Sequence, residues 1–259
     1  MSDKQLKLSN SIALIFMLTL NAMAIILPIG GRTTGELSDM YPNLFVPAGF
    51  TFSIWSVIYI LLIVFVIYQW IVSLDKSRIH GIGPWFLING LANGCWILAW
   101  HYLQIELSLF IMLILLYSLL KIHQRLQINY FTPKSTPWLV FPAFSIYLGW
   151  ISVATIANFT TLLVSYDWSG GPFSQDTWAA LMLSIAVVLG VILLYRHKDV
   201  FYAAVIAWAS YGILSKRRTE ADAMDSMIQH FSEVGMYVMI IGILLTITIG
   251  IVGIQKKRL

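Results

Sequence analysis

Tryptophan, tyrosine and asparagine recur at helical spacings in three apolar stretches of this chain. Six of these side chains share a helix face with a partner three, four or eight positions away: Trp55, Tyr59, Asn93, Trp96, Trp150 and Asn158. Indole and phenol rings can stack on a flat ligand, and amides can hydrogen-bond its polar edge. The pattern therefore favours binding over proton transfer or nucleophilic attack.

Residues that usually carry catalysis are sparse. The sequence holds no glycine-rich phosphate loop, no paired cysteines and no HExxH motif. It also shows no acid–base pair or metal cluster, so we expect neither enzymatic activity nor a cofactor. His101, at the end of an apolar segment, either reaches a ligand or caps its helix in water, and the cap is the simpler interpretation. The other histidines are expected in solvated loops: His80, His123, His197 and His230.

The stretches that carry these residues belong to a series of eight apolar segments without a single Asp, Glu, Lys or Arg. The segments are 11–29, 50–72, 84–100, 107–120, 138–164, 177–195, 200–214 and 234–254. About 20 such residues, at ~1.5 Å each, cross a hydrocarbon core of roughly 30 Å. The sequence therefore predicts an all-α fold, a polytopic bundle of membrane helices.

The composition agrees with a membrane protein. Of the 259 residues, 59% are hydrophobic and 11% are charged, whereas soluble domains carry about 25% charged residues. The formal net charge is +4, but Lys and Arg lie in short loops at segment ends, where they orient the protein and meet anionic lipid. We therefore expect no nucleic acid as a partner. The single cysteine, Cys95, excludes an internal disulfide.

The distribution of Lys and Arg predicts a cytoplasmic N-terminus, in what we expect to be a bacterial cell membrane. Basic residues alternate between the two sides through seven segments, with the N-terminal tail and the 121–134 loop inside and the 30–49 loop outside. The alternation ends at the basic cluster 216–218, which lies outside if segment 200–214 spans and inside if that segment is re-entrant. Seven and eight spans both remain open, and we favour eight.

Two connecting segments have features of their own. The 30–49 loop is long, rich in Gly and Pro, and neutral to acidic. Loops of this length are commonly functional, so we expect it to act as a lid over the site. Residues 219–233 have the periodicity of an amphipathic helix that connects two spans at the membrane interface. Its apolar face would consist of Met224, Met227, Ile228 and Phe231.

Three motifs on the second, third and fifth segments fall in register. The second segment opens with PAGFTFSIWSVIY (47–59), the third contains NGLANGCW (89–96), and the fifth contains YLGWISVATIAN (147–158). Together they resemble the TspO/translocator-protein family, also called tryptophan-rich sensory proteins. That family has a Pro eight residues before a Trp that is followed by Tyr four positions on, then Asn-x-x-Trp, then a Trp with Asn eight residues later.

The resemblance covers residues 1–165 and implies a five-helix membrane bundle there. It also implies an aromatic pocket, formed by the six residues named above, for a planar apolar ligand such as a tetrapyrrole or a sterol-like lipid. Residues 166–259 then form an extension of about three further transmembrane helices. Four positions depart from the family pattern and bear on the ligand more than on the fold: Gly49 replaces a Trp, Ser53 replaces a Pro, and Trp100 and His101 replace paired Phe.

The leading hypothesis is an integral membrane receptor or binding protein, with lipid, the small apolar ligand and a second copy of the chain as partners. The main alternative is a transporter or permease for a neutral small molecule, because the additional helices would complete a translocation path. A structural subunit of a membrane assembly is a third hypothesis.

The structural hypothesis gives the same residues a different role. Trp55, Trp96 and Trp150 then only pack the helices together, and Asn93 hydrogen-bonds Asn158 across the bundle. Tryptophans at segment ends are expected to anchor the protein at the membrane interfaces: Trp70, Trp85, Trp138, Trp168 and Trp178.

Overall fold

The computed structural model describes residues 2–27, 29–71, 79–126, 140–168, 170–219 and 226–256, and every regular element in those ranges is a helix. The long helices are α1 (Asp3–Ile26), α3 (Ile54–Ile71), α5 (Trp85–His101), α6 (Ile105–Leu126), α7 (Val140–Ser165), α8 (Gln175–His197), α9 (Val200–Thr219) and α10 (Ser226–Lys256). The short ones are η1 (Ile29–Gly31), α2 (Thr34–Asp39), η2 (Gly49–Ser53) and α4 (Ile79–Ile82). The predicted all-α bundle, with three long helices after residue 165, is confirmed.

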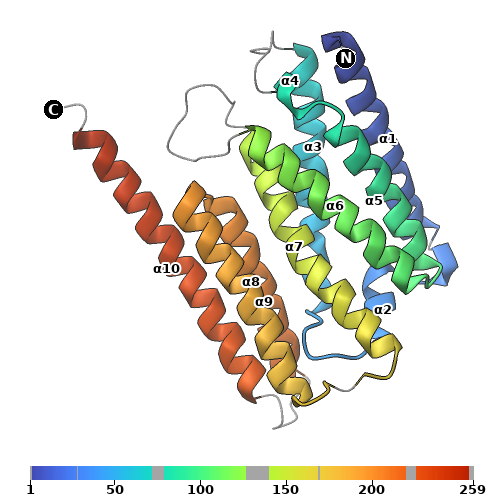
Figure 1. Cartoon of the computed structure of the whole chain (residues 1–259), viewed down its shortest axis with the longest axis vertical. Helices are drawn as coiled ribbons and strands as arrows, with labels where there is room; N and C mark the ends of the chain where they lie inside the picture. The colour runs from blue at the N-terminus through green and yellow to red at the C-terminus, as the bar shows by residue number, and fades with distance from the viewer. Residues whose placement is uncertain are drawn as a thin grey trace.

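The long helices run side by side and alternate in direction, so the end of α10 and the start of α1 lie at the same end of the bundle, on opposite sides of it (Figure 1). Six of them combine the length and the apolar composition of a membrane span: α1, α3 together with η2, α6, α7, α8 and α10. Of the other two, α5 has 17 residues and α9 carries the basic cluster 216–218 in its last turn. Because α9 is continuous over 20 residues and antiparallel to α8 and α10, the structure favours eight helices over a re-entrant segment.

Two helices begin earlier than their apolar runs predict. Ser2 and Gln5 form a capping box that starts α1 ahead of the apolar run. Helix α10 starts at Ser226, so residues 226–233 belong to it and the predicted separate interfacial helix is wrong there; residues 220–225 lie outside the described ranges. Of the residues predicted to form its apolar face, Ile228 is buried, Met227 and Phe231 are each 42% exposed, and Met224 lies outside the described residues.

The core is centred on α7. In the most apolar part of α7, 61% of the residues are buried, whereas in that of α10 only 11% are. Three rings from different helices, Phe65, Phe86 and Phe144, meet edge to face with centroids 5.0–5.9 Å apart. The position of α7 explains why the fifth apolar segment shows no polar face.

Two glycines allow α1 to approach α5 closely. A Cβ atom at Gly90 would lie 2.8 Å from the backbone oxygen of Ala13, and one at Gly94 would lie 2.5 Å from the ring of Phe16. Both distances are too short for a side chain, so these small residues serve helix packing and do not enlarge a ligand site.

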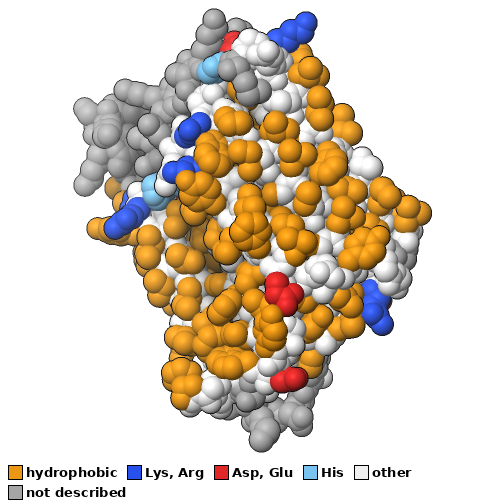
Figure 2. All heavy atoms as spheres, turned by 45° about the vertical axis from the view of Figure 1, so that its right-hand side comes forward, with side chains coloured by type: hydrophobic (Ala, Val, Ile, Leu, Met, Phe, Trp, Pro, Cys, Tyr) orange, Lys and Arg blue, Asp and Glu red, His pale blue; other side chains and the backbone are white. Residues whose placement is uncertain are grey.

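The face of the molecule drawn in Figure 2 is largely apolar. Hydrophobic side chains cover most of the face in Figure 2, with few charged ones among them. Large apolar residues on several helices are exposed, among them Ile60, Phe110 and Leu113 at 49–62%. Such continuous exposure is rare on soluble monomers and fits contact with lipid.

Candidate functional site

An aromatic pocket lies between α3, α5 and α7, beneath the first loop. Four of the six predicted ligand-binding residues line it: Trp55, Trp96, Trp150 and Asn158. The lining also includes Thr34, Ser38, Pro47, Phe52, Trp100, Val153, Ala154, Ala157 and Thr161. The helical spacing in the sequence places Trp100 on the same face as Trp96, and Ala154 and Ala157 on the same face as Trp150. No spacing rule relates the loop residues to the pocket.

Four rings from α3 and α5 form a continuous stack along one wall. Tyr59 lies on Trp55 with 5.5 Å between centroids, Trp55 on Trp96 with 6.1 Å, and Trp96 on Trp100 with 6.0 Å. The interplanar angles are 22°, 30° and 21°. The four-residue spacing brings Trp55 and Tyr59 together on α3, and Trp96 and Trp100 together on α5. The contact between Trp55 and Trp96 then joins the two pairs. Tyr59 supports Trp55 but does not itself line the pocket.

Helix α7 supplies the opposite wall. The Trp150 ring stands edge-on to Phe52 at 5.8 Å and to Trp55 at 6.3 Å. Ala154 and Asn158 follow on the same face at four-residue intervals. Because Ala154 is small, it leaves space between the indole ring of Trp150 and the amide of Asn158, both of which line the pocket.

Two buried hydrogen-bond donors in this lining lack an acceptor among the described residues. The indole nitrogens of Trp96 and Trp150 are buried and unbonded. Asn158, in the same lining, accepts a hydrogen bond of 3.1 Å at Oδ1 from Ser108 Oγ. A buried donor without a partner costs about 1–3 kcal/mol, so an acceptor atom on a bound molecule would lower the free energy. Trp85 and Trp178 also have unbonded indole nitrogens, but they lie outside this pocket.

The pocket is narrow in this structure. It measures about 500 Å³ including its open mouth, but only about 40 Å³ of this space admits the centre of a water molecule. Sites for drug-sized ligands enclose about 300–1,000 Å³. A polycyclic ligand therefore requires the first loop or the ring walls to move outward.

Asn93 lies outside the pocket, in a polar node that joins three helices. Its Oδ1 accepts a 2.7 Å hydrogen bond from Asn21 of α1, and its Nδ2 donates one of 2.7 Å to the Tyr147 hydroxyl of α7. The postulated bond between Asn93 and Asn158 is therefore wrong. Tyr147 also meets the Trp55 ring edge-on at 5.9 Å, so the node supports the pocket from within the core.

The first loop is tied to α5 where it begins. His101 is buried, with Nδ1 2.8 Å from the backbone oxygen of Ile29 and Nε2 3.3 Å from the Thr34 hydroxyl. A carbonyl only accepts, so Nδ1 carries the proton. Trp100 Nε1 adds a 3.3 Å bond to the oxygen of Thr34. The expectation of a solvated cap at His101 is wrong, because its ring bonds inward to the loop and does not line the pocket.

Where it ends, the loop is tied to α9. Residues 47–53, here called the strap, form two hydrogen bonds with α9. Ala48 N donates to the Gly212 oxygen at 3.0 Å, and Trp208 Nε1 of α9 donates to the Thr51 oxygen at 3.0 Å. A Cβ atom at Gly212 would overlap Thr51 Oγ1, so this glycine is required for the close approach. The predicted lid does cover the pocket through Thr34, Ser38 and Pro47, but it is held at both ends.

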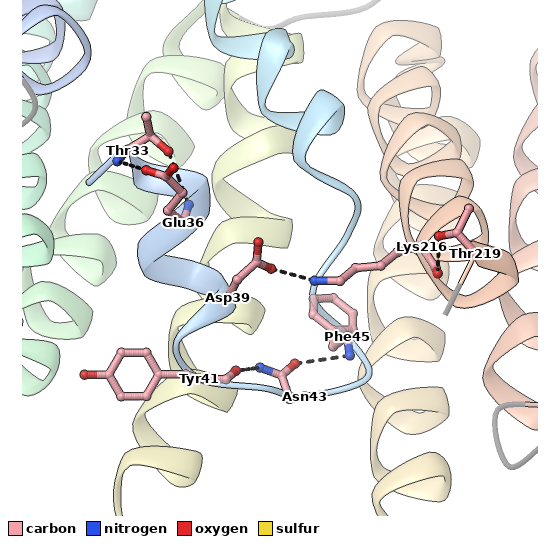
Figure 3. Close-up of polar contacts among 8 residues, drawn as sticks. All are labelled: Thr33, Glu36, Asp39, Tyr41, Asn43, Phe45, Lys216 and Thr219. Atoms are coloured by element: carbon pink, nitrogen blue, oxygen red, sulfur yellow. Dashed lines mark hydrogen bonds and ion pairs between the residues drawn. The ribbon is translucent and has the colours of Figure 1, made fainter. Parts of the chain in front are cut away.

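An ion pair makes a third tie to α9. Lys216 Nζ lies 2.6 Å from Asp39 Oδ1 at the end of α2, as Figure 3 shows. A capping box of Thr33 and Glu36 starts α2. The hydrogen bonds that Glu36 accepts from the Thr33 backbone and hydroxyl lower the pKa of this carboxyl.

His123 is buried, and its assignment to a solvated loop is wrong. Its Nε2 lies 3.0 Å from Asp199 Oδ2, an atom that also accepts a 2.8 Å bond from Ser145 Oγ. Asp199 Oδ1 accepts from Tyr202 N and so caps the start of α9. The cluster joins α6, α7 and α9. The sequence gives no signal for a buried Asp199, because this residue lies between two charge-free segments, where a solvated loop is expected.

The tryptophans at segment ends differ in exposure. Trp70 is 48% exposed at the end of α3. Trp85 contacts Tyr117, and Trp168 meets Trp178 with centroids 4.6 Å apart, so these three pack partly inside the bundle. Trp138 lies outside the described residues. Within the described ranges no three His, Cys, Asp or Glu side chains are grouped to hold a metal ion.

Comparison with known proteins gives one match. The sequence model of the family described as TSPO-like protein matches residues 7–250 and so takes in α8, α9 and most of α10 as well. Neither the curated proteins nor the solved structures yield a significant match. Since the matched region covers nearly the whole chain and the helical membrane bundle agrees with it, the chain belongs to the TSPO-like protein family.

Proposed function

We propose that this protein binds, within the membrane, a planar and largely apolar molecule, such as a tetrapyrrole or a sterol-like lipid, that carries at least one hydrogen-bond acceptor. The observation that carries the proposal is the pair of buried, unbonded indole nitrogens of Trp96 and Trp150 in a largely apolar pocket lined by aromatic rings. Flat rings suit the stacked wall, and a carbonyl, carboxylate or hydroxyl oxygen suits the donors. Membership of the TSPO-like family supports the same reading.

The pocket residues favour binding over catalysis. Its described lining contains indole, phenyl, hydroxyl and amide groups and no carboxylate, histidine or lysine. Acid–base catalysis relies on such titratable groups near the reacting atoms. We therefore propose a receptor or carrier role rather than turnover. We also retain the cytoplasmic N-terminus as part of the proposal, because it rests on the basic residues of the sequence.

A titration with a porphyrin tests the proposal. The full chain is reconstituted in lipid nanodiscs, and the Soret band of the porphyrin is followed as protein is added, with empty nanodiscs as the control. We expect a saturable shift with one porphyrin per chain. A shift no larger than that of empty nanodiscs contradicts tetrapyrrole binding, and the same titration with a fluorescent sterol then tests the other ligand class. Protein-dependent flux across sealed vesicles would assign transport instead.

A further inference from the structure

A second hollow, here called the α7–α8 hollow, lies between the first loop, the end of α7 and the start of α8. It shares no lining residue with the aromatic pocket. It measures about 360 Å³ including its mouth, of which about 30 Å³ admits the centre of a water molecule. Its described lining carries no charged side chain and is mostly apolar, chiefly through Leu44, Phe45, Val164, Trp168, Trp178 and Ala179.

Two tryptophans form an aromatic wall of this hollow. The rings of Trp168 and Trp178 meet edge to face, with centroids 4.6 Å apart. Trp168 reaches this place because of the way α7 ends. Asp167 has a positive φ of 56°, and its N–H donates to the Val164 oxygen. Trp168 N donates to the Leu163 oxygen, which completes a Schellman motif. The local backbone of α7 therefore positions the wall.

The wall contains a buried donor without a partner. Trp178 Nε1 is buried and has no acceptor among the described residues. Two polar side chains of the lining bond to backbone instead. Asn43 donates to the Tyr41 oxygen and accepts from Phe45 N (Figure 3). Thr160 donates to a backbone oxygen of its own helix. An unpaired buried donor costs about 1–3 kcal/mol, so an acceptor atom on a bound molecule would lower the free energy.

The size and charge of the hollow restrict what can bind there. Its volume lies near the lower end of the range of about 300–1,000 Å³ for small-molecule sites, which favours a compact ligand. A lining without charges favours a neutral one, because an unpaired charge is costly to bury.

We propose that the α7–α8 hollow is a second binding site, for a compact neutral molecule whose apolar ring or short chain carries one carbonyl or hydroxyl oxygen. The oxygen accepts a hydrogen bond from Trp178 Nε1, and the apolar part contacts the aromatic wall. The site does not depend on what occupies the aromatic pocket, since the two linings have no residue in common.

A matched pair of probes tests the proposal. Cyclohexanone and methylenecyclohexane have nearly the same shape, but only the ketone accepts a hydrogen bond. The full chain, labelled with ¹⁵N-tryptophan, is placed in lipid nanodiscs, and its indole N–H signals are assigned with Trp→Phe variants. We expect cyclohexanone to move the Trp178 signal downfield in a saturable manner, and methylenecyclohexane to move it less. The Trp85 indole nitrogen is also buried and unbonded but lies outside the hollow, so its signal reports general partition into the membrane.

A variant separates the hydrogen bond from packing. Trp178→Phe keeps a ring on the wall and removes the donor, and binding is then followed through the Trp168 signal. The preference for cyclohexanone over methylenecyclohexane should fall about two- to tenfold, the value of one neutral hydrogen bond. Trp85→Phe removes an unbonded donor elsewhere and should keep the wild-type preference. A packing defect in Trp178→Phe would weaken both probes equally and leave the preference unchanged.

Three results would overturn the proposal. The first is a Trp178 signal that does not saturate with cyclohexanone or moves no more than the Trp85 signal. The second is an equal effect of the two probes on Trp178 in the wild-type protein. The third is an unchanged preference for the ketone in Trp178→Phe.

Discussion

At the scale of single residues, the buried and unbonded indole nitrogen of Trp150 is a donor that we propose contacts the ligand. Trp150→Phe keeps an aromatic ring on the wall and removes the donor. We expect binding of the pocket ligand to weaken about two- to tenfold, the value of one neutral hydrogen bond. The unfolding temperature of the free protein should change little, because the stability gained by removing an unsatisfied buried donor offsets the packing lost with the smaller ring. Affinity equal to wild type would show that this nitrogen does not contact the ligand.

Asp199 is the residue on which three helices depend at the other end of the bundle. Asp199→Ala leaves His123 and Ser145 without their shared acceptor and uncaps α9. Removing one partner of a buried pair costs about 3–5 kcal/mol. We expect a clear fall in unfolding temperature in detergent. Asp176→Ala, which also removes a carboxylate that caps a helix from a more exposed position, is the matched control and should cost less.

Spacing on a helix predicts which residues share a face, but not which face meets which. The stripes Trp55–Tyr59 and Trp150–Ala154–Asn158 are visible in the sequence, and the structure keeps them. The partners of Asn93 and Asn158 are Asn21, Tyr147 and Ser108, and they depend on how α1, α5, α6 and α7 pack. No local rule contains that information.

At the scale of elements, the strap depends on α9. Gly212→Ala places a Cβ atom where Thr51 Oγ1 lies, so the strap or the helix must shift. Overpacking of this kind costs about 1–3 kcal/mol. Because Pro47 and Phe52 of the strap line the pocket, we expect faster dissociation of the bound ligand in stopped-flow experiments. Gly49→Ala lies in the strap with no heavy atom within 4 Å of its new Cβ, and should behave as wild type.

The first loop shows where sequence reasoning stops for an element. Its length and glycine content predict a functional loop, and it does lie over the pocket. Its attachment to α9 comes from residues about 160 positions apart, and such distant contacts leave no periodic signal. Distant contacts also involve the basic cluster 216–218, which interrupts the alternation of charge along the sequence. Lys216 forms an ion pair with Asp39, and Arg218 forms one with Glu233.

At the scale of the whole molecule, the predicted division at residue 165 stays a prediction. The TSPO-like family match and the contacts between the first loop and α9 both cross it. The helix count is clearer. With eight long helices of alternating direction, the first loop and the end of α9 lie at one end, and the start of α1 and the end of α10 lie at the other.

The proposed orientation rests on the basic residues of the sequence and can be measured. In a Cys95→Ser background, Lys4→Cys should react with an impermeant maleimide only from the cytoplasmic side, and Arg32→Cys only from the outside. Both positions are exposed in the structure. Labelling of Arg32→Cys from the cytoplasmic side alone would reverse the orientation, while the fold would stand.

The central claim is that a flat ligand stacks in the pocket of Trp55, Trp96 and Trp150. The most direct measurement is the equilibrium affinity for a porphyrin of Trp96→Ala and Trp150→Ala, followed through the Soret band so that the loss of a fluorescent tryptophan does not alter the signal. A stacked ring contributes about 0.5–1.5 kcal/mol beyond its buried area, so each variant should bind at least about fivefold more weakly. Trp70→Ala, at the exposed end of α3, is the control and should match wild type. Equal affinity in all four proteins would contradict the account, because Trp96 and Trp150 would then only pack the helices.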